Sequence, residues 1–163
     1  MFKVLVAVDG SPIAKQTLEF ARDLLAGKET AVTVFHVIPQ HMIYGRAVVP
    51  AEVYDMPAER AASTALLEQN AQYLQEGGVG PTIERHIAVG DPADLILTAA
   101  SDQDADLIIL GSRGLNAAQR FLVGSTSTKV TTHAQCAVLV VHPKESAAAT
   151  SASDTAASWA TTD

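Results

Sequence analysis

The sequence predicts one doubly wound α/β domain built on a five-stranded, mainly parallel sheet. Short valine-rich runs alternate along the chain with longer segments of helical periodicity, and this order is typical of a parallel sheet covered by helices. Several of the runs are apolar almost throughout, as expected of strands that are buried on both faces. The chain is 48% hydrophobic over 163 residues, which is enough to bury one core of ordinary size.

Each element has its own signal. Five apolar runs predict strands, namely Phe2 to Val8, Thr30 to Ile38, Thr82 to Val89, Ala105 to Leu110 and Cys136 to Val141. Four segments predict helices, which begin at Pro12, Ala58, Pro92 and Ser125. Two of these share a start signal, because Ser11-Pro12 and Asp91-Pro92 each place a capping side chain before a proline.

The composition divides the chain into a domain over residues 1–143 and a tail over residues 144–163. The tail is almost entirely alanine, serine and threonine, so we expect it to be disordered. Inside the domain, the segment from Pro39 to Pro57 lacks periodicity and holds three prolines. Long unpatterned segments in compact domains are often functional, and we expect this one to form a lid over the ligand.

Several classes of protein are excluded by composition. The chain has no apolar run of 18 residues, so we expect no membrane helix. A net charge of −7 argues against nucleic-acid binding. The apolar run at the N-terminus is too short for a signal sequence, and we therefore expect a cytoplasmic protein. Cys136 is the only cysteine, and its apolar neighbours predict a buried structural thiol.

The charge is unevenly distributed. From Leu107 to Lys144 there is no acidic residue but there are four basic ones, whereas the rest of the chain has 7 basic and 18 acidic residues. A cationic segment in an acidic protein could attract an anion. The alternative is chance, helped by two buried strands that exclude acids in any case.

The most informative spacing follows the fourth predicted strand. Gly111-Ser112-Arg113-Gly114 is separated by nine residues from Gly124-Ser125-Thr126-Ser127, which opens a predicted helix. Glycines allow backbone amides to approach an anion and to adopt positive φ, and a helix N-terminus attracts phosphate. Arg113 would either pair with that phosphate or face solvent. The alternative is a plain connection with two glycine turns and a serine N-cap. Neither a Walker loop nor a dinucleotide fingerprint is present.

This spacing, Gly111-x2-Gly114-x9-Gly124-Ser125, resembles the nucleotide-binding signature of the universal stress protein family. Four other segments resemble that family in the same order, namely Val6 to Ser11, Val89 to Ala93, Ala105 to Gly114 and Val138 to Val141. The resemblance covers residues 1 to about 143. It implies an adenine nucleotide alpha hydrolase-like fold and a stress-response regulatory protein that binds ATP or AMP.

The resemblance also implies roles for single residues. Asp9 would bind the ribose hydroxyls, and Ala7 and Val37 would line the adenine slot. Gly111, Ser112, Arg113 and Gly114 would run beside the ribose and phosphates, and Gly124, Ser125, Thr126 and Ser127 would hold the phosphates. If Val138 to Val141 forms an edge strand, its unpaired backbone groups invite pairing, and the resemblance implies a homodimer in which two copies of it meet antiparallel. The alternative is an edge blunted by the following Pro143-Lys144.

Alternatives to a regulatory nucleotide binder stay open. Asp9 would otherwise be a catalytic acid or a turn-forming residue. The chain has no evident nucleophile–base pair, so we expect no catalytic residue and no resident metal. Slow ATP hydrolysis would need Mg²⁺ between the phosphates and Asp9 or Ser125. The remaining alternatives are a partner-binding module with an empty pocket and a dedicated hydrolase or phosphotransferase. His36 lies in a buried run and is interpreted as a core histidine.

Overall fold

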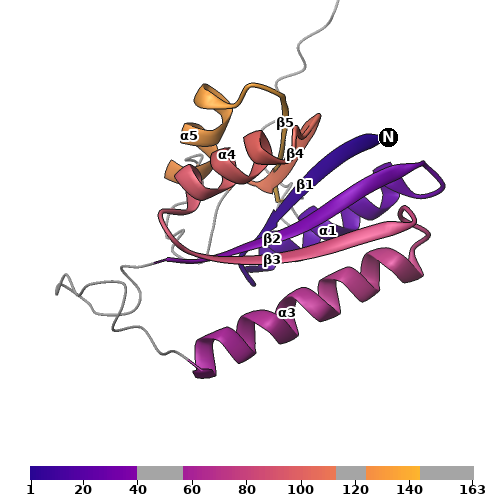
Figure 1. Cartoon of the computed structure of the whole chain (residues 1–163), viewed down its shortest axis with the longest axis horizontal. Helices are drawn as coiled ribbons and strands as arrows, with labels where there is room; N and C mark the ends of the chain where they lie inside the picture. The colour runs from indigo at the N-terminus through magenta and orange to yellow at the C-terminus, as the bar shows by residue number, and fades with distance from the viewer. Residues whose placement is uncertain (40–56, 113–123, 144–163) are drawn as a thin grey trace, which may run out of the picture.

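In the computed structural model, which describes residues 1–39, 57–112 and 124–143, a five-stranded sheet lies between two layers of helices (Figure 1). The strands are β1 (Phe2–Val8), β2 (Thr30–Pro39), β3 (Thr82–Gly90), β4 (Leu107–Gly111) and β5 (Ala137–Val141). The helices are α1 (Pro12–Leu25), α3 (Pro57–Glu76), α4 (Pro92–Asp102) and α5 (Ser125–His133). The predicted elements are confirmed, with ends that differ by one or two residues.

The sheet is parallel throughout, in the order β3-β2-β1-β4-β5. The predicted fold class is therefore confirmed. β1 is the central strand, and its Ala7 lies beside Phe35 of β2 and Leu110 of β4. The carboxyl ends of β1, β2 and β4 consequently meet at one edge of the sheet, where ligands bind in folds of this type.

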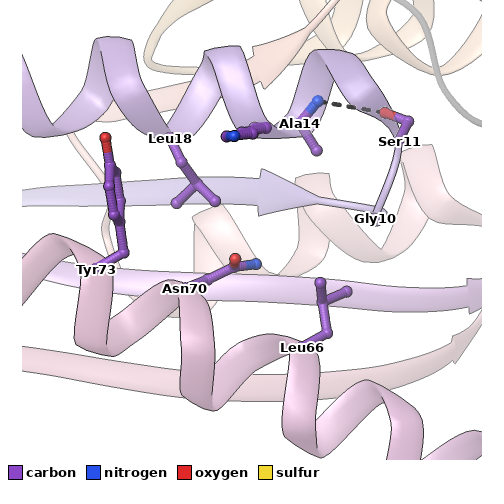
Figure 2. Close-up of a pocket in the computed structure, with 8 residues that line it drawn as sticks. Gly10, Ser11, Ala14, Leu18, Leu66, Asn70 and Tyr73 are labelled. Atoms are coloured by element: carbon purple, nitrogen blue, oxygen red, sulfur yellow. Dashed lines mark hydrogen bonds between the residues drawn. The ribbon is translucent and has the colours of Figure 1, made fainter.

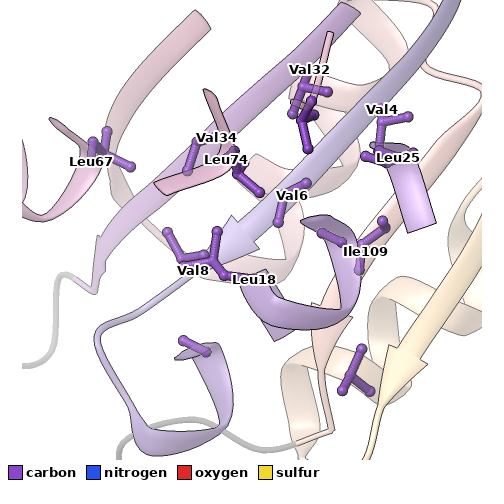
Figure 3. Packing of buried hydrophobic residues seen from close by; sticks show 14 of the residues in the cluster. Val4, Val6, Val8, Leu18, Leu25, Val32, Val34, Leu67, Leu74 and Ile109 are labelled. Carbon is purple, nitrogen blue, oxygen red and sulfur yellow. The ribbon is translucent and has the colours of Figure 1, made fainter. Parts of the chain in front are cut away.

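Alternation along the central strands divides the core between the two faces of the sheet. Val4, Val6 and Val8 of β1 pack with apolar residues of α1 and α3 (Figure 3). The intervening Leu5 packs on the other face, in the cluster that includes Ile96 of α4 and Val130 of α5. Both faces are covered because parallel strands need a helix on each crossover, and this explains the near-continuous apolar runs of the sequence.

Two helix starts follow the predicted signal. The hydroxyl oxygen of Ser11 accepts a hydrogen bond from the amide of Ala14 at 3.3 Å, and Oδ1 of Asp91 accepts one from the amide of Asp94 at 3.0 Å. Helix α5 differs, because its N-cap residue is Gly124, which has no capping side chain. The serine N-cap considered for this helix is therefore wrong.

Two predictions fall outside the described residues. The lid predicted between Pro39 and Pro57 has only those two end residues within the described ranges, where they end β2 and begin α3. The disordered tail over residues 144–163 has none. Among the helices that the structure describes, none combines the length and the apolarity needed to cross a membrane.

Candidate functional site

The candidate site lies at the carboxyl ends of β1 and β4, from which the chain continues to opposite faces of the sheet. After β1 the chain enters α1 on one face of the sheet, and α5, which follows β4 in the chain, lies on the other face. Strands β1 and β4 are neighbours, so their carboxyl ends flank the point at which the direction of winding reverses. In doubly wound sheets this switch point forms a crevice that accepts ligands.

The turn after β1 fixes the position of Asp9. Its Oδ1 accepts a hydrogen bond from the amide of Ser11 at 3.0 Å, which is the geometry of an Asx turn. Gly10 between them has a φ of 73°, a conformation that glycine adopts with little strain. The turn-forming interpretation of Asp9 therefore describes its structure, and the same turn holds its carboxylate at the end of β1 beside the switch point.

Ser112 joins three elements at this edge. Its amide donates to the carbonyl oxygen of Val141 at the end of β5, at 2.8 Å, and its own carbonyl oxygen accepts from the amide of Gly124 at 2.7 Å. The start of α5 is thereby attached to the end of β4. As a result the amino end of α5 opens at the same sheet edge as Asp9.

The hydroxyl of Ser127 strengthens this junction. The side chain is 1% exposed, and its Oγ lies 3.1 Å from the carbonyl oxygen of Ser112 and 2.9 Å from that of Gly124. A hydroxyl has one hydrogen to donate, so it satisfies one of these carbonyls at a time. The phosphate-holding role implied for Ser127 can therefore use its backbone amide, while its hydroxyl holds the loop closed.

The amino end of α5 has the properties of an anion site. The first helical hydrogen bond runs from the amide of Thr128 to the carbonyl of Gly124 at 3.0 Å. The amides of Ser125, Thr126 and Ser127 precede it, and no side chain at the N-cap competes for them. The side chain of Ser125 is exposed and that of Thr126 is half-buried. Amides at a helix N-terminus together with hydroxyls suit a phosphate group.

Of the two properties predicted for the glycines of this segment, only the open approach to backbone amides fits the conformation of Gly124. Gly124 has φ −63° and ψ 156°, an extended conformation that any residue adopts, and Gly111 lies within β4. The expected positive φ is therefore wrong at Gly124. What glycine contributes at this position is the absence of a side chain in front of the amides of α5. Arg113 and Gly114 lie outside the described residues.

One buried polar atom at this edge has no partner. Ser112 is 1% exposed, and its hydroxyl oxygen makes no hydrogen bond with any described residue. Leaving such a group unsatisfied costs about 1–3 kcal/mol, and a ligand oxygen that reached it would offset that cost. The hydroxyl and amide donors of this edge therefore fit an oxygen-rich anionic ligand.

The two residues expected to line an adenine slot lie on one face of the sheet. Ala7 of β1 and Val37 of β2 both belong to the apolar cluster beneath α4. Ala7 is half-buried, whereas Val37 is only 6% exposed. Since the side chain of Val37 is largely packed in the core, its contribution to a ligand would come from the backbone at the end of β2.

Lys129, one of the four basic residues counted in the cationic segment, is paired with acidic residues in the structure. Nζ of Lys129 in α5 lies 2.7 Å from Oδ1 of Asp94 and 3.5 Å from Oδ1 of Asp91, both at the start of α4. The hydrogen bond that Lys129 donates to the Asp94 carboxylate raises the pKa of Lys129. Acids that are absent from this segment of the sequence are thus supplied in space by α4, and Lys129 is paired with them.

The remaining titratable candidates are structural. His36 is buried and its Nδ1 donates to the carbonyl oxygen of Val8 at 2.8 Å, as expected of a core histidine. Cys136 is half-buried rather than buried, and desolvation raises the pKa of its thiol. Within residues 1–39, 57–112 and 124–143, no three His, Cys, Asp or Glu side chains are grouped as a metal site would require.

Two features of the site have no signal in the sequence. The carbonyl of Ser112 is a backbone atom, so its role at the junction could not be inferred from the residue type. The pairing of Lys129 with α4 joins residues 35 positions apart, Asp94 and Lys129. Only the packing of α4 beside α5 brings these two charges together.

Comparisons with known proteins agree on the family. Residues 1–142 match the model of the universal stress protein family. A universal stress protein of Synechocystis is 34% identical over 150 residues, which cover 85% of this chain and 96% of the relative. The structure of the universal stress protein UspA from Lactobacillus plantarum superimposes with a TM-score of 0.74 at 27% identity, covering 86% of this chain and 97% of that one.

A third comparison concerns a structure with a ligand. A universal stress protein family member from Arabidopsis thaliana, solved with AMP bound, has a TM-score of 0.59 and 24% identity. The match covers 89% of this chain and 94% of that chain. At this identity the likeness shows a shared fold.

Proposed function

This chain belongs to the universal stress protein family, and from that premise we propose that it is an adenine-nucleotide-binding regulatory protein of the stress response. One observation carries the proposal. The uncapped amino end of α5 is fastened by Ser112 to the sheet edge at which Asp9 also lies. An anion site and a carboxylate thus lie at one edge of the sheet, as binding of a phosphorylated sugar requires.

The phosphates are assigned to the start of α5. Amides of Ser125, Thr126 and Ser127 and the hydroxyls of Ser125 and Thr126 supply donors, and the helix dipole adds attraction for negative charge. The hydroxyl of Ser112 adds one further donor at the same edge. Arg113 and Gly114, which the family signature also includes, would complete this side of the site.

The nucleoside is assigned to the ends of β1 and β2. A carboxylate can accept hydrogen bonds from two ribose hydroxyls at once, and the turn at Gly10 holds Asp9 in place for this. The adenine ring would lie against Ala7 and the backbone near Val37. The relative from Arabidopsis thaliana with bound AMP supports an adenine nucleotide as the ligand. We propose that the phosphate site would also accommodate the additional phosphates of ATP.

The proposed output is regulatory rather than catalytic. Among the described residues at this edge, the imidazole of His36 is buried with its Nδ1 engaged by the Val8 carbonyl. The exposed His142 follows the end of β5, and neither histidine is hydrogen-bonded to a described serine or threonine hydroxyl. Without a base next to a nucleophile, the arrangement holds a phosphate instead of cleaving it. The proposal includes a cytoplasmic location, where a free thiol such as Cys136 stays reduced.

The proposed assembly is a homodimer through β5. This strand lies at the edge of the sheet and pairs only with β4 among the described strands, so one row of its backbone groups is left for another chain. Val138, Leu139 and Val140 are half-buried in the single chain. Pairing two copies antiparallel would cover these side chains and satisfy the edge.

The proposal is tested on the purified full-length chain. We expect adenine nucleotide to be released by heat and identified by chromatography, and we expect AMP or ATP to raise the Tm. At a ligand concentration of about 100 times Kd, binding stabilises the folded state by about 2.7 kcal/mol, which is several degrees for a domain of this size.

Other outcomes point to the alternatives. If no nucleotide co-purifies and millimolar AMP and ATP leave the Tm unchanged, the pocket is empty and the chain is better described as a partner-binding module. Turnover of ATP above about 1 per second, the low end of ordinary enzymes, would instead indicate a hydrolase or phosphotransferase.

A further inference from the structure

We propose that a groove between α1 and α3 is a second binding site, and that it takes a small amphipathic carboxylate. The groove has a volume of about 280 Å³ and lies on the α1/α3 side of the sheet, away from α4 and α5 (Figure 2). It begins at the Gly10–Ser11 turn and continues between the two helices as far as Tyr73. This site does not depend on nucleotide binding.

The groove follows from the positions of side chains on two helices. Residues three or four apart share one face of a helix, so Ala14 and Leu18 of α1 face the same way, as do Leu66, Asn70 and Tyr73 of α3. Figure 2 shows Leu18, Leu66 and Asn70 directed into the space between the helices. These side chains are too short to fill that space, and the cavity remains between them.

The floor of the groove is apolar. Ala14 and Leu18 are each 5% exposed, and the half-buried Leu66 forms the opposite wall. A hydrocarbon chain or ring laid on these methyl groups would be removed from water, at about 25 cal/mol per Å² of apolar surface. Since ligand pockets usually measure about 300–1,000 Å³, a cavity of this size suits a ligand smaller than a nucleotide.

The charge of the groove selects an anion. Among the described residues that line the groove, Lys15 is the only charged one, and no described residue forms a salt bridge with it. The side-chain amide of Asn70 and the hydroxyl of Tyr73 add neutral donors. The Arg22 guanidinium lies 4.9 Å from the centre of the Tyr73 ring at that end, but it is paired with Asp23 at 2.8 Å. The charge that selects the anion is therefore that of Lys15. A protein with a net charge of −7 therefore presents positive charge beside an apolar floor.

A matched set of probes tests the two chemical features. Octanoate, octanol and octylamine share one hydrocarbon chain but carry an anionic, a neutral and a cationic head group. We expect isothermal titration of the full chain, with each probe kept below its micellar concentration, to show the highest affinity for octanoate. Octanol should bind about fivefold more weakly, because it lacks the charge that interacts with the exposed Lys15. Octylamine should bind more weakly still, because its charge repels that of Lys15.

Variants locate the binding. Lys15→Gln should remove the preference for octanoate over octanol, whereas Lys28→Gln, the same change on an exposed lysine that does not line the groove, should keep it. Leu66→Trp should fill the cavity and abolish binding of all three probes. In ¹H–¹⁵N NMR spectra, octanoate should shift the amide signals of Ser11 and Asn70.

Three results would overturn the inference. They are equal affinity for the three probes, an unchanged octanoate preference in Lys15→Gln, and octanoate-induced shifts confined to Ser112 and Ser125. The Gly124→Val variant separates this inference from the proposed function, because it should lose AMP binding and retain octanoate binding. If wild type binds octanoate but not AMP, the proposed function fails and the groove assignment stands.

Discussion

The carbonyl oxygen of Ser112 accepts a hydrogen bond from the amide of Gly124 at 2.7 Å, so two described residues that are 12 positions apart lie against each other at the edge of the sheet. This bond places the first turn of α5 beside the end of β4. It thereby fixes the N-terminus of α5 in a defined position relative to the sheet.

Replacing Gly124 with valine tests the phosphate site. The backbone there is extended, with φ −63° and ψ 156°, which valine adopts readily. We therefore expect the fold and the Tm to be retained while AMP affinity falls by at least tenfold, because the side chain would stand before the amides of α5. Titration calorimetry measures the affinity. Equal affinity in Gly124→Val and wild type would place the phosphates elsewhere.

Replacing Ser127 with alanine tests the hydrogen bonding of its hydroxyl to the carbonyls of Ser112 and Gly124. The variant loses a buried hydroxyl that lies within 3.1 Å of the Ser112 carbonyl, and we expect the free energy of unfolding to fall by about 1 kcal/mol. Thr132→Ala is the matched control, because the hydroxyl of Thr132 donates to Thr128 within the same helix but is exposed. Denaturation by urea compares the two variants, and equal losses of the free energy of unfolding would show that the Ser127 hydroxyl adds no stability at this junction.

The cap of α4 predicts a dependence of stability on pH. The amide of Asp94 holds the pKa of Asp91 below its ordinary value, and the charge of Lys129 lowers it further. Because the folded pKa is lowered, the carboxylate stabilises the fold fully above its unfolded pKa of about 3.9. That contribution is lost as the pH falls through the lower folded value.

Two variants at Asp91 separate charge from capping. Asparagine caps helices as well as aspartate does, so Asp91→Asn should lose only the charge interactions, and its difference from wild type should shrink below about pH 4. Asp91→Ala should lose the cap as well, at a cost of about 1 kcal/mol at every pH. Urea denaturation at pH 7 and pH 3 measures both. A difference between wild type and Asp91→Asn that grows on acidification would contradict the sign.

The free edge of β5 predicts how the dimer would be broken. A lysine at Val140 places charge on a strand that would otherwise pair with its own copy, and like charges brought together there repel. We expect sedimentation velocity at micromolar concentration to show a dimer for wild type and a monomer for Val140→Lys. Val89→Lys on β3, the opposite edge of the sheet, should remain a dimer. A monomeric wild type would rule out this assembly.

Much of this molecule could be predicted because its signals are local. The valine-rich runs and the two proline-marked helix starts depend on residues close together in the chain, and both Ser11 and Asp91 cap helices as their types indicate. The order of the elements placed Asp9 and Gly111 at the carboxyl ends of strands β1 and β4, which flank the switch point of the sheet.

The errors arose where a residue type allows more than one geometry. Gly124 was expected to have a positive φ because glycine tolerates one, yet its backbone is extended. Ser127 was expected to hold phosphate, and its buried hydroxyl turns to the carbonyls of Ser112 and Gly124, which leaves only its backbone amide for that role. Lys129 was expected to contribute positive charge for an anionic ligand, but in the structure its Nζ lies 2.7 Å from Oδ1 of Asp94 in α4.

The sequence by itself determined the fold class, the family and the edge of the sheet at which the candidate site lies, because periodicity, caps and glycine spacing are written in the order of the residues. Only the tertiary structure decided which polar groups at that edge remain available to a ligand. It also decided that Lys15 lines an apolar groove between α1 and α3. Such outcomes depend on contacts between segments far apart in the chain, where packing brings charges and hydroxyls to partners that no local pattern names.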